Sequence, residues 1–75
     1  MKRLPRVTGK ECVRALEMAG FIVARSKGSH FIMKHSDGRK TVVPVHQGDV
    51  LGPGLLKRIL TDAEMEVDNF RELLR

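Results

Sequence analysis

The sequence predicts an α+β fold in which helices precede and follow a three-stranded antiparallel sheet. Three observations predict this order. A helix-start pattern with helical spacing of apolar residues occurs before residue 20, three short β-type segments occupy residues 21–45, and a proline opens another apolar-periodic segment at residue 53. Helices that come before and after an uninterrupted meander in the chain most simply cover one face of the sheet, so we expect an α-β-β-β-α sandwich.

The first helix is predicted over residues 9–19. Thr8-Gly9-Lys10-Glu11 has the form of a capping box, in which Thr8 accepts from the third helical amide and Glu11 reaches back. Apolar residues then recur at helical spacing, at Cys12, Val13, Leu16 and Ala19. Gly20 follows as the expected stop.

Three β-type segments follow, at residues 21–26, 30–35 and 39–45. Two-residue turns are expected at Lys27-Gly28 and at Asp37-Gly38, because glycine and Asp-Gly pairs adopt positive φ easily. Pro44 cannot donate to a strand ladder, which favours an edge position for the third strand. The middle of the chain is therefore predicted to be an antiparallel meander.

Two further helices complete the fold. Pro53 is expected to begin a helix through Leu60, and Asp68 is expected to cap a short last helix that contains Phe70. The residues that we expect in the core include Cys12, Met18, Phe31, Met33 and Phe70.

Composition limits the class of protein. The 75 residues allow one domain, and the net charge of +5 arises from 14 Lys and Arg against 9 Asp and Glu. Residues 1–40 hold ten of the basic residues and only three acids, which favours a polyanionic partner, although basic residues also simply keep small proteins soluble. The single cysteine excludes an internal disulfide and a cysteine-based zinc site. With no apolar run of membrane-spanning length and no secretory signal, we expect a cytoplasmic protein.

Strand alternation assigns the side chains of the sheet to two faces. With the two-residue turns above, His30 is expected beside Arg25 and Val45, on a face that points away from the helices. That outward face is predicted to hold Phe21, Val23, Arg25, His30, Ile32, Lys34, Thr41, Val43 and Val45. The helix-facing side is predicted to hold Ile22, Ala24, Phe31, Met33, His35, Lys40, Val42 and Pro44. An outward face this apolar suggests a protein partner.

His30 is the residue with the clearest chemical interest, because it follows a turn signal and opens an apolar run in a basic stretch. His30 and His35 are an odd number of positions apart on one strand, so they point to opposite faces and cannot share a metal ion. No Asp or Glu lies close in sequence to His30 to complete a ligand set around it, and we expect neither a metal nor a cofactor. Acid–base work or hydrogen bonding remains for the histidines.

RNA is a substrate on which such a histidine could act, because it carries its own nucleophile, the 2′-hydroxyl beside each phosphodiester. Cleavage needs a base, positive charge on the phosphorane and an acid for the leaving oxygen. His30 suits the first or third role, and Arg25, Lys27 and Lys34 suit the second. A non-catalytic RNA-binding module on the same surface, and a pure protein-interaction domain, are the alternatives.

Three other residues are predicted to contribute to this RNA-binding surface. Gly28 and Ser29 shape the turn before His30, and Ser29 has no triad that would make it a nucleophile. His46 is expected either to act as a general acid or to fasten the loop after the third strand. The residues alone leave the identity of the general acid open.

Several motifs occur together along the chain in one order. They are Gly20-Phe21, Arg25-x-Lys27-Gly28-Ser29-His30, Val43-Pro44-x-His46, Gly54-x-Leu56-x-x-Ile59-Leu60 and Phe70. This series resembles the HicA (YcfA-like) toxin family of bacterial type II toxin–antitoxin pairs, from Leu4-Pro5 to the Phe70 tail. The resemblance implies one HicA-like domain over residues 1–75 with a double-stranded-RNA-binding-domain-like fold. It also implies an mRNA interferase whose catalytic histidine falls on His30, and a HicB antitoxin that covers the active face.

The chain departs from the family pattern in two places. Family members usually carry a glycine after the second helix, near Glu64, so the helix must end differently here. A lysine is common in the segment that is Leu51-Gly52-Pro53 in this chain, so one cation that contacts the RNA backbone is expected to be missing.

Overall fold

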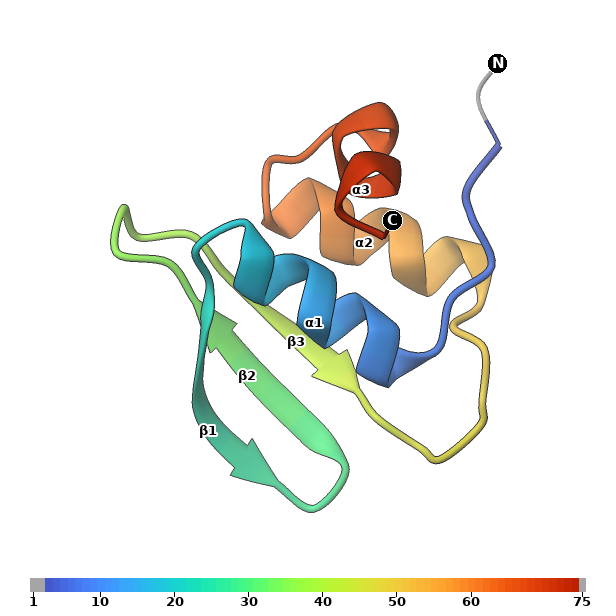
Figure 1. Cartoon of the computed structure of the whole chain (residues 1–75). Helices are drawn as coiled ribbons and strands as arrows, with labels where there is room; N and C mark the ends of the chain where they lie inside the picture. Colours follow the sequence, from blue (N-terminus) through green and yellow to red (C-terminus); the bar gives the residue numbers. More distant parts are fainter. Residues whose placement is uncertain (1–2, 75) are drawn as a thin grey trace.

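The computed structural model describes residues 3–74. Its elements, in chain order, are α1 (Gly9–Met18), β1 (Ile22–Lys27), β2 (His30–Lys34), β3 (Lys40–Pro44), α2 (Pro53–Asp62) and α3 (Val67–Leu73). The predicted α+β class and the α-β-β-β-α order are confirmed, with α3 as a short tail (Figure 1). Within the described residues, no helix is long and apolar enough to cross a membrane.

The helices lie on one side of a sheet of strand order β1-β2-β3 (Figure 1). α1 contacts all three strands, α2 contacts β3, and α3 packs on α1. β3 is an edge strand, as Pro44 predicts. Among residues 3–74 no helix crosses the opposite side of the sheet, which we call the open face.

α1 begins at the predicted residue and ends at Met18, one residue before the predicted end. The Thr8 hydroxyl accepts from the backbone N–H of Glu11 at 3.2 Å, and the Glu11 carboxylate accepts from the backbone N–H of Thr8 at 2.9 Å. After the helix, Gly20 has a φ of +99°, and the N–H of Phe21 donates to the carbonyl of Leu16. These contacts satisfy backbone groups at both helix ends.

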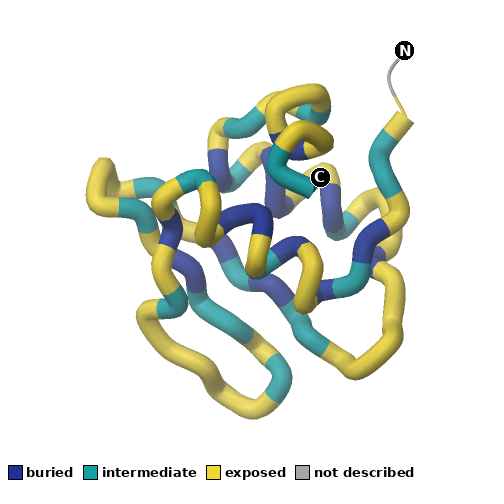
Figure 2. Tube along the Cα trace, viewed as in Figure 1, coloured by how far each residue is buried: buried dark blue, intermediate teal, exposed yellow. Residues whose placement is uncertain are grey.

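The core lies between the helices and the sheet, where the buried segments meet in Figure 2. Its largest fully buried side chains include Phe21, Phe70, Leu16, Met33 and Leu56. Phe31 is half-buried against this core. The expectation for Met18 is wrong, because its side chain, at the last residue of α1, is 62% exposed.

The later helices differ in detail from their predicted bounds. α2 begins at Pro53 as expected but continues two residues beyond Leu60, to Asp62. The N-cap of α3 is Glu66, and Asp68 lies in the first turn of that helix instead of capping it. An acidic side chain there is favourable in either place because of the helix dipole.

The turn between β2 and β3 is longer than predicted, which changes the faces of β3. The N–H of His35 donates to the carbonyl of Arg39, and Gly38, at φ +102°, closes a three-residue loop over residues 36–38. Lys34 therefore pairs with Lys40, one position earlier than a two-residue turn would give. A one-residue change in register exchanges the two faces of a strand. Consequently the prediction for β3 is wrong: the buried residues are Thr41 and Val43, and the open face holds Lys40, Val42 and Pro44.

The turn between β1 and β2 consists of Gly28 and Ser29, not Lys27 and Gly28. His30 is therefore opposite Lys27 and Pro44, and the expectation that it lies beside Arg25 and Val45 is wrong. Val45 instead packs against the core.

A register shift at Ala24 gives β1 a bulge. Because of it, Val23 pairs with the buried Met33 and faces the helices, while Arg25 pairs with Ile32 and faces away from them. The predicted faces of Phe21, Val23 and Ile22 are corrected accordingly: the first two pack inward and Ile22 is 63% exposed.

Candidate active site

His30 is the first residue of β2, at the corner of the open face. Phe31 and Met33 pack toward the helices, so alternation directs His30 to the open face, as predicted. Its side chain is exposed and has no hydrogen bond or ion pair to another residue in the described part of the chain. The imidazole is therefore available to an external molecule.

The turn before His30 has a defined geometry. Gly28 has a φ of +60°, whereas Ser29 is outside the left-handed region, which is the pattern of a type II′ hairpin turn. A Cβ at Gly28 would meet no atom within 4 Å, so the outer side of this turn is open. Glycine is required here for its backbone conformation and leaves the approach to His30 unobstructed.

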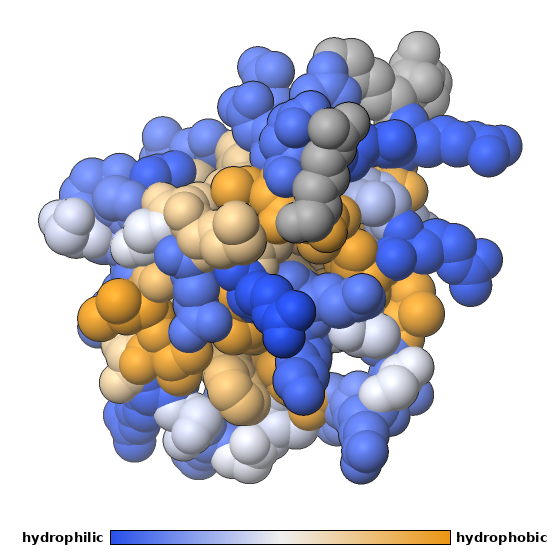
Figure 3. Space-filling view, viewed as in Figure 1, coloured by the Kyte–Doolittle hydropathy of each residue, from blue (hydrophilic) through white to orange (hydrophobic). Residues whose placement is uncertain are grey.

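The predicted cations share the open face but lie at different distances from His30. Lys27 is directly opposite His30, and Arg25 is two residues further along β1. Lys34 is at the other end of β2, four residues away, which corresponds to about 13 Å at the usual strand rise. Figure 3 shows hydrophilic side chains projecting around much of the molecule, with apolar areas between them. Of these three cations, Lys27 is the one directly beside His30.

The structure brings His46 to the same corner. The Ser29 hydroxyl lies 3.4 Å from His46 Nε2, and the N–H of Val45 donates to the carbonyl of Ser29. His46 is exposed at the start of the loop between β3 and α2. Three predicted site residues, Ser29, His30 and His46, thus lie together although the last is 16 positions away in sequence.

His35 lies at the opposite end of the sheet and serves the fold. Its ring packs edge-to-face on Phe21 with centroids 5.1 Å apart, and its Nδ1 accepts from the N–H of Asp37. Arg39, which no sequence pattern marks, donates to Asp37 and to the carbonyl of Ala63 after α2, and its guanidinium lies 5.1 Å from the centre of the Phe21 ring. This group fastens the β2–β3 turn to the end of α2.

The other chemically reactive groups do not form a second centre. Burial raises the pKa of the Cys12 thiol to about 12, so the reactive thiolate is absent at neutral pH. Within residues 3–74, no three His, Cys, Asp or Glu side chains are placed to hold a metal ion together.

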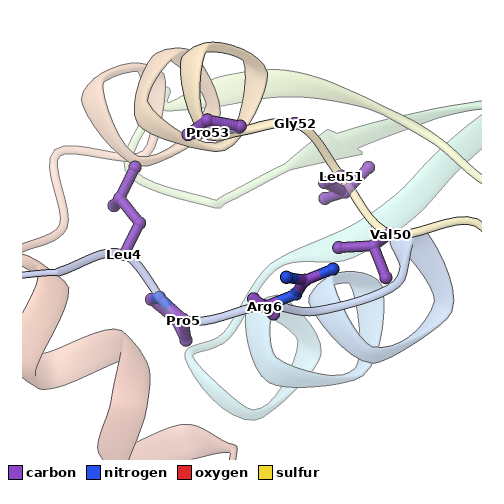
Figure 4. Close-up of a pocket in the computed structure, with 7 residues that line it drawn as sticks. All are labelled: Leu4, Pro5, Arg6, Val50, Leu51, Gly52 and Pro53. Carbon is purple, nitrogen blue, oxygen red and sulfur yellow. The ribbon is translucent and has the colours of Figure 1, made fainter.

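One hollow of about 400 Å³ lies between the N-terminal segment and the β3–α2 loop (Figure 4). Its lining is Leu4, Pro5, Arg6, Val50, Leu51, Gly52 and Pro53. None of these belongs to the predicted site, and the lining contains no acid–base pair. The open face, not this hollow, holds the histidines.

The fold and surface described so far define a class: a small basic α-β-β-β-α protein with one uncovered sheet face that carries cations and an exposed histidine. Comparison with known protein families matches residues 9–65 to the HicA toxin of bacterial toxin–antitoxin systems. The chain therefore belongs to the HicA toxin family, and its partner class is an antitoxin. No curated protein matches the chain.

Proposed function

We propose that this toxin is an endoribonuclease that cleaves mRNA in the cytoplasm without a metal ion, with His30 as its catalytic residue. The observation that carries the proposal is the exposed, unpaired imidazole of His30 at the corner of a cationic sheet face, within the described residues. Imidazole is the side chain that gains and loses a proton closest to neutral pH. It is thus suited to take the proton of a ribose hydroxyl.

The chemistry follows from the neighbours of His30. The 2′-oxygen attacks the adjacent phosphorus while His30 accepts its proton, and negative charge develops on the phosphorane oxygens. Lys27, directly opposite His30, is the cation that supports the proposed stabilisation of that charge. The bare outer side of Gly28 supports a close approach of the RNA backbone.

The remaining predicted RNA contacts act on the strand on either side of the cleaved bond. Arg25 and Lys34 lie on the same open face as His30, but Lys34 is too far away to share its phosphate. We assign both to neighbouring phosphates, which position the RNA without reading its bases. The chain has no Trp or Tyr, so base stacking contributes little and we expect a loose sequence preference.

The same face is proposed to bind a HicB-like antitoxin. Ile32, Val42 and Pro44 form a partly buried apolar strip, and Ile22 beside it is 63% exposed. A protein that covers this strip with apolar residues and presents acids to the surrounding cations would block RNA from His30. Inhibition then needs no change in the toxin.

The test compares the parent with His30→Ala on an end-labelled transcript, with a chelator present throughout. We expect the parent to produce 2′,3′-cyclic phosphate and 5′-hydroxyl ends, and the variant to cleave about 10²–10⁴-fold more slowly. Lys40→Ala is the matched control, because it removes an exposed residue from the far end of the same face. Circular dichroism and antitoxin binding check that both variants fold.

Two results would contradict the proposal. Equal cleavage by His30→Ala and the parent would remove His30 from the reaction. Intact RNA with the parent, together with a modest loss of affinity in His30→Ala, would instead make the protein a non-catalytic RNA-binding module.

A further inference from the structure

We infer that His46 is the second proton-transfer group of this site, the general acid that protonates the leaving 5′-oxygen. The inference rests on the proposed ribonuclease function and goes beyond it, because it gives a chemical role to a loop residue. It depends on three observations: the position of His46 relative to β2, its contact with Ser29, and its exposure.

The first observation is positional. Pro44 is the cross-strand neighbour of His30, and the N–H of Val45 still donates to the carbonyl of Ser29, so chain pairing continues beyond β3. His46 follows immediately. With a strand spacing of about 5 Å and a rise of about 3.3 Å per residue, this offset separates the Cα atoms of His30 and His46 by roughly 8 Å. Two imidazoles at that separation can reach opposite sides of one phosphate.

The second observation concerns orientation. The hydroxyl of Ser29 lies 3.4 Å from Nε2 of His46, and no described residue is bonded to Nδ1 of the ring. Ser29 therefore acts as a positioning residue at one nitrogen, and Nδ1 is the nitrogen that remains for the substrate. A 3.4 Å contact is long for a hydrogen bond, so it limits the direction of the ring without fixing it.

The third observation is the chemical surroundings. His46 is exposed; strand pairing brings Lys27 of β1 and His30 of β2 to this corner, and Asp49 belongs to the same loop as His46. Asp49 donates its backbone N–H to the carbonyl of His46, which folds the loop back on itself. Of these groups, a second imidazole is the one best suited to hold a proton and release it near neutral pH.

The step balances with two histidines and no other reactant. Neutral His30 takes the proton from the 2′-hydroxyl as the 2′-oxygen forms a bond to phosphorus. The bond from phosphorus to the 5′-oxygen breaks, and protonated His46 gives its proton to that oxygen. The products are a 2′,3′-cyclic phosphate and a 5′-hydroxyl, with His30 protonated and His46 neutral.

The decisive experiment uses a leaving group that needs no acid. In an RNA with sulfur in place of the bridging 5′-oxygen at the cleavage site, the leaving group departs as a thiolate. A thiolate leaving group does not require protonation. We expect His46→Ala to cleave ordinary RNA about 10²–10⁴-fold more slowly than the parent but the sulfur-containing RNA at nearly the parent rate. His30→Ala is expected to remain slow on both RNAs, because its role is at the other oxygen.

A pH profile and a matched control complete the design. The parent rate on ordinary RNA should rise and then fall with pH, and His46→Ala should lose the fall on the alkaline side. Gln47→Ala removes the adjacent exposed side chain of the same loop and should leave rate and profile unchanged.

The outcomes separate the two proposals. If the parent does not cleave RNA, the proposed function fails. If the parent cleaves but His46→Ala is equally fast on ordinary RNA, or is equally slow on both RNAs, His46 is not the acid; in the second case it contributes to binding or folding instead. Recovery on the sulfur-containing RNA supports the inference.

Discussion

The end of α2 offers a direct test of backbone energetics in this chain. Glu64 is the only non-glycine residue with positive φ in the described part of the chain, at +52°. It follows the C-cap Ala63, its N–H donates to the carbonyl of Thr61, and the N–H of Met65 donates to the carbonyl of Leu60. This is the Schellman arrangement, in which glycine is the favoured residue, so the expectation that α2 ends differently without a glycine is wrong.

Glu64→Gly should therefore stabilise the protein. The left-handed conformation costs an L-residue about 1–2 kcal/mol. Glycine removes that cost but adds about 0.4–1 kcal/mol of freedom to the unfolded chain. The exposed Glu64 side chain has no hydrogen bond or ion pair to another described residue that would be lost. The net expectation is a gain of about 0.5–1 kcal/mol, equivalent to a rise of about 2–8 °C in Tm for a domain of this size.

Thermal and urea unfolding followed by circular dichroism measure this gain. Glu64→Ala is the matched control, since it removes the same charge but keeps a Cβ, and it should show no comparable gain. If Glu64→Gly is no more stable than Glu64→Ala, backbone strain is not what the glutamate imposes, and the reasoning fails.

Three further predictions concern stability and accessibility. A Cβ at Gly9 would lie 2.2 Å from a backbone oxygen of β3, so Gly9→Ala should lower the free energy of unfolding by about 1–3 kcal/mol. Gly54 lies on α2, where an added Cβ would meet open space, so Gly54→Ala should leave the free energy of unfolding equal or raise it. Urea denaturation compares the two variants. Hydrogen bonding by the backbone and guanidinium of Arg39 lowers the pKa of Asp37, so this carboxylate adds stability above about pH 4 that is lost as the pH falls through its folded-state pKa. Asp37→Asn should reduce the loss of unfolding free energy at acid pH. An unchanged loss would exclude the contribution of Asp37. Burial raises the pKa of Cys12 from 9.0 to about 12, so the thiol favours the folded state below pH 9 and loses this effect as the pH rises toward 12. A thiol reagent at neutral pH should label Cys12 only when the protein unfolds. Rapid labelling of the folded protein would refute the burial of this thiol.

The element order was predictable because each element carries its own local signal. The capping box at Thr8, the glycine after α1 and the proline that opens α2 act within one turn of chain, and all appear in the structure as expected. The outward direction of His30 was also predictable, since Phe31 and Met33 identify the buried side of β2.

The faces of the other strands were not predictable from alternation alone. An Asp-Gly pair fits either a two-residue or a three-residue turn, and the choice moved Thr41 and Val43 into the core. The bulge at Ala24 interrupts the period-two pattern without a glycine to mark it. The contact between Ser29 and His46 depends on how the β3–α2 loop returns to the first turn, which no local pattern records.

The hydrogen bonds of Arg39 determine which end of the sheet resists local unfolding. Arg39 joins the β2–β3 turn to the carbonyl of Ala63, and the Thr41 hydroxyl donates to Asp62 at 3.1 Å, so these polar ties gather at one end of the sheet. The histidine corner is held by the pairing of Val45 with Ser29 and is bordered by the exposed residues 46–50. Amide exchange should therefore start at the end of the sheet that holds His30 and His46 and reach the Arg39 end last. The proposed catalytic residues would then lie at the end of the sheet that opens most easily.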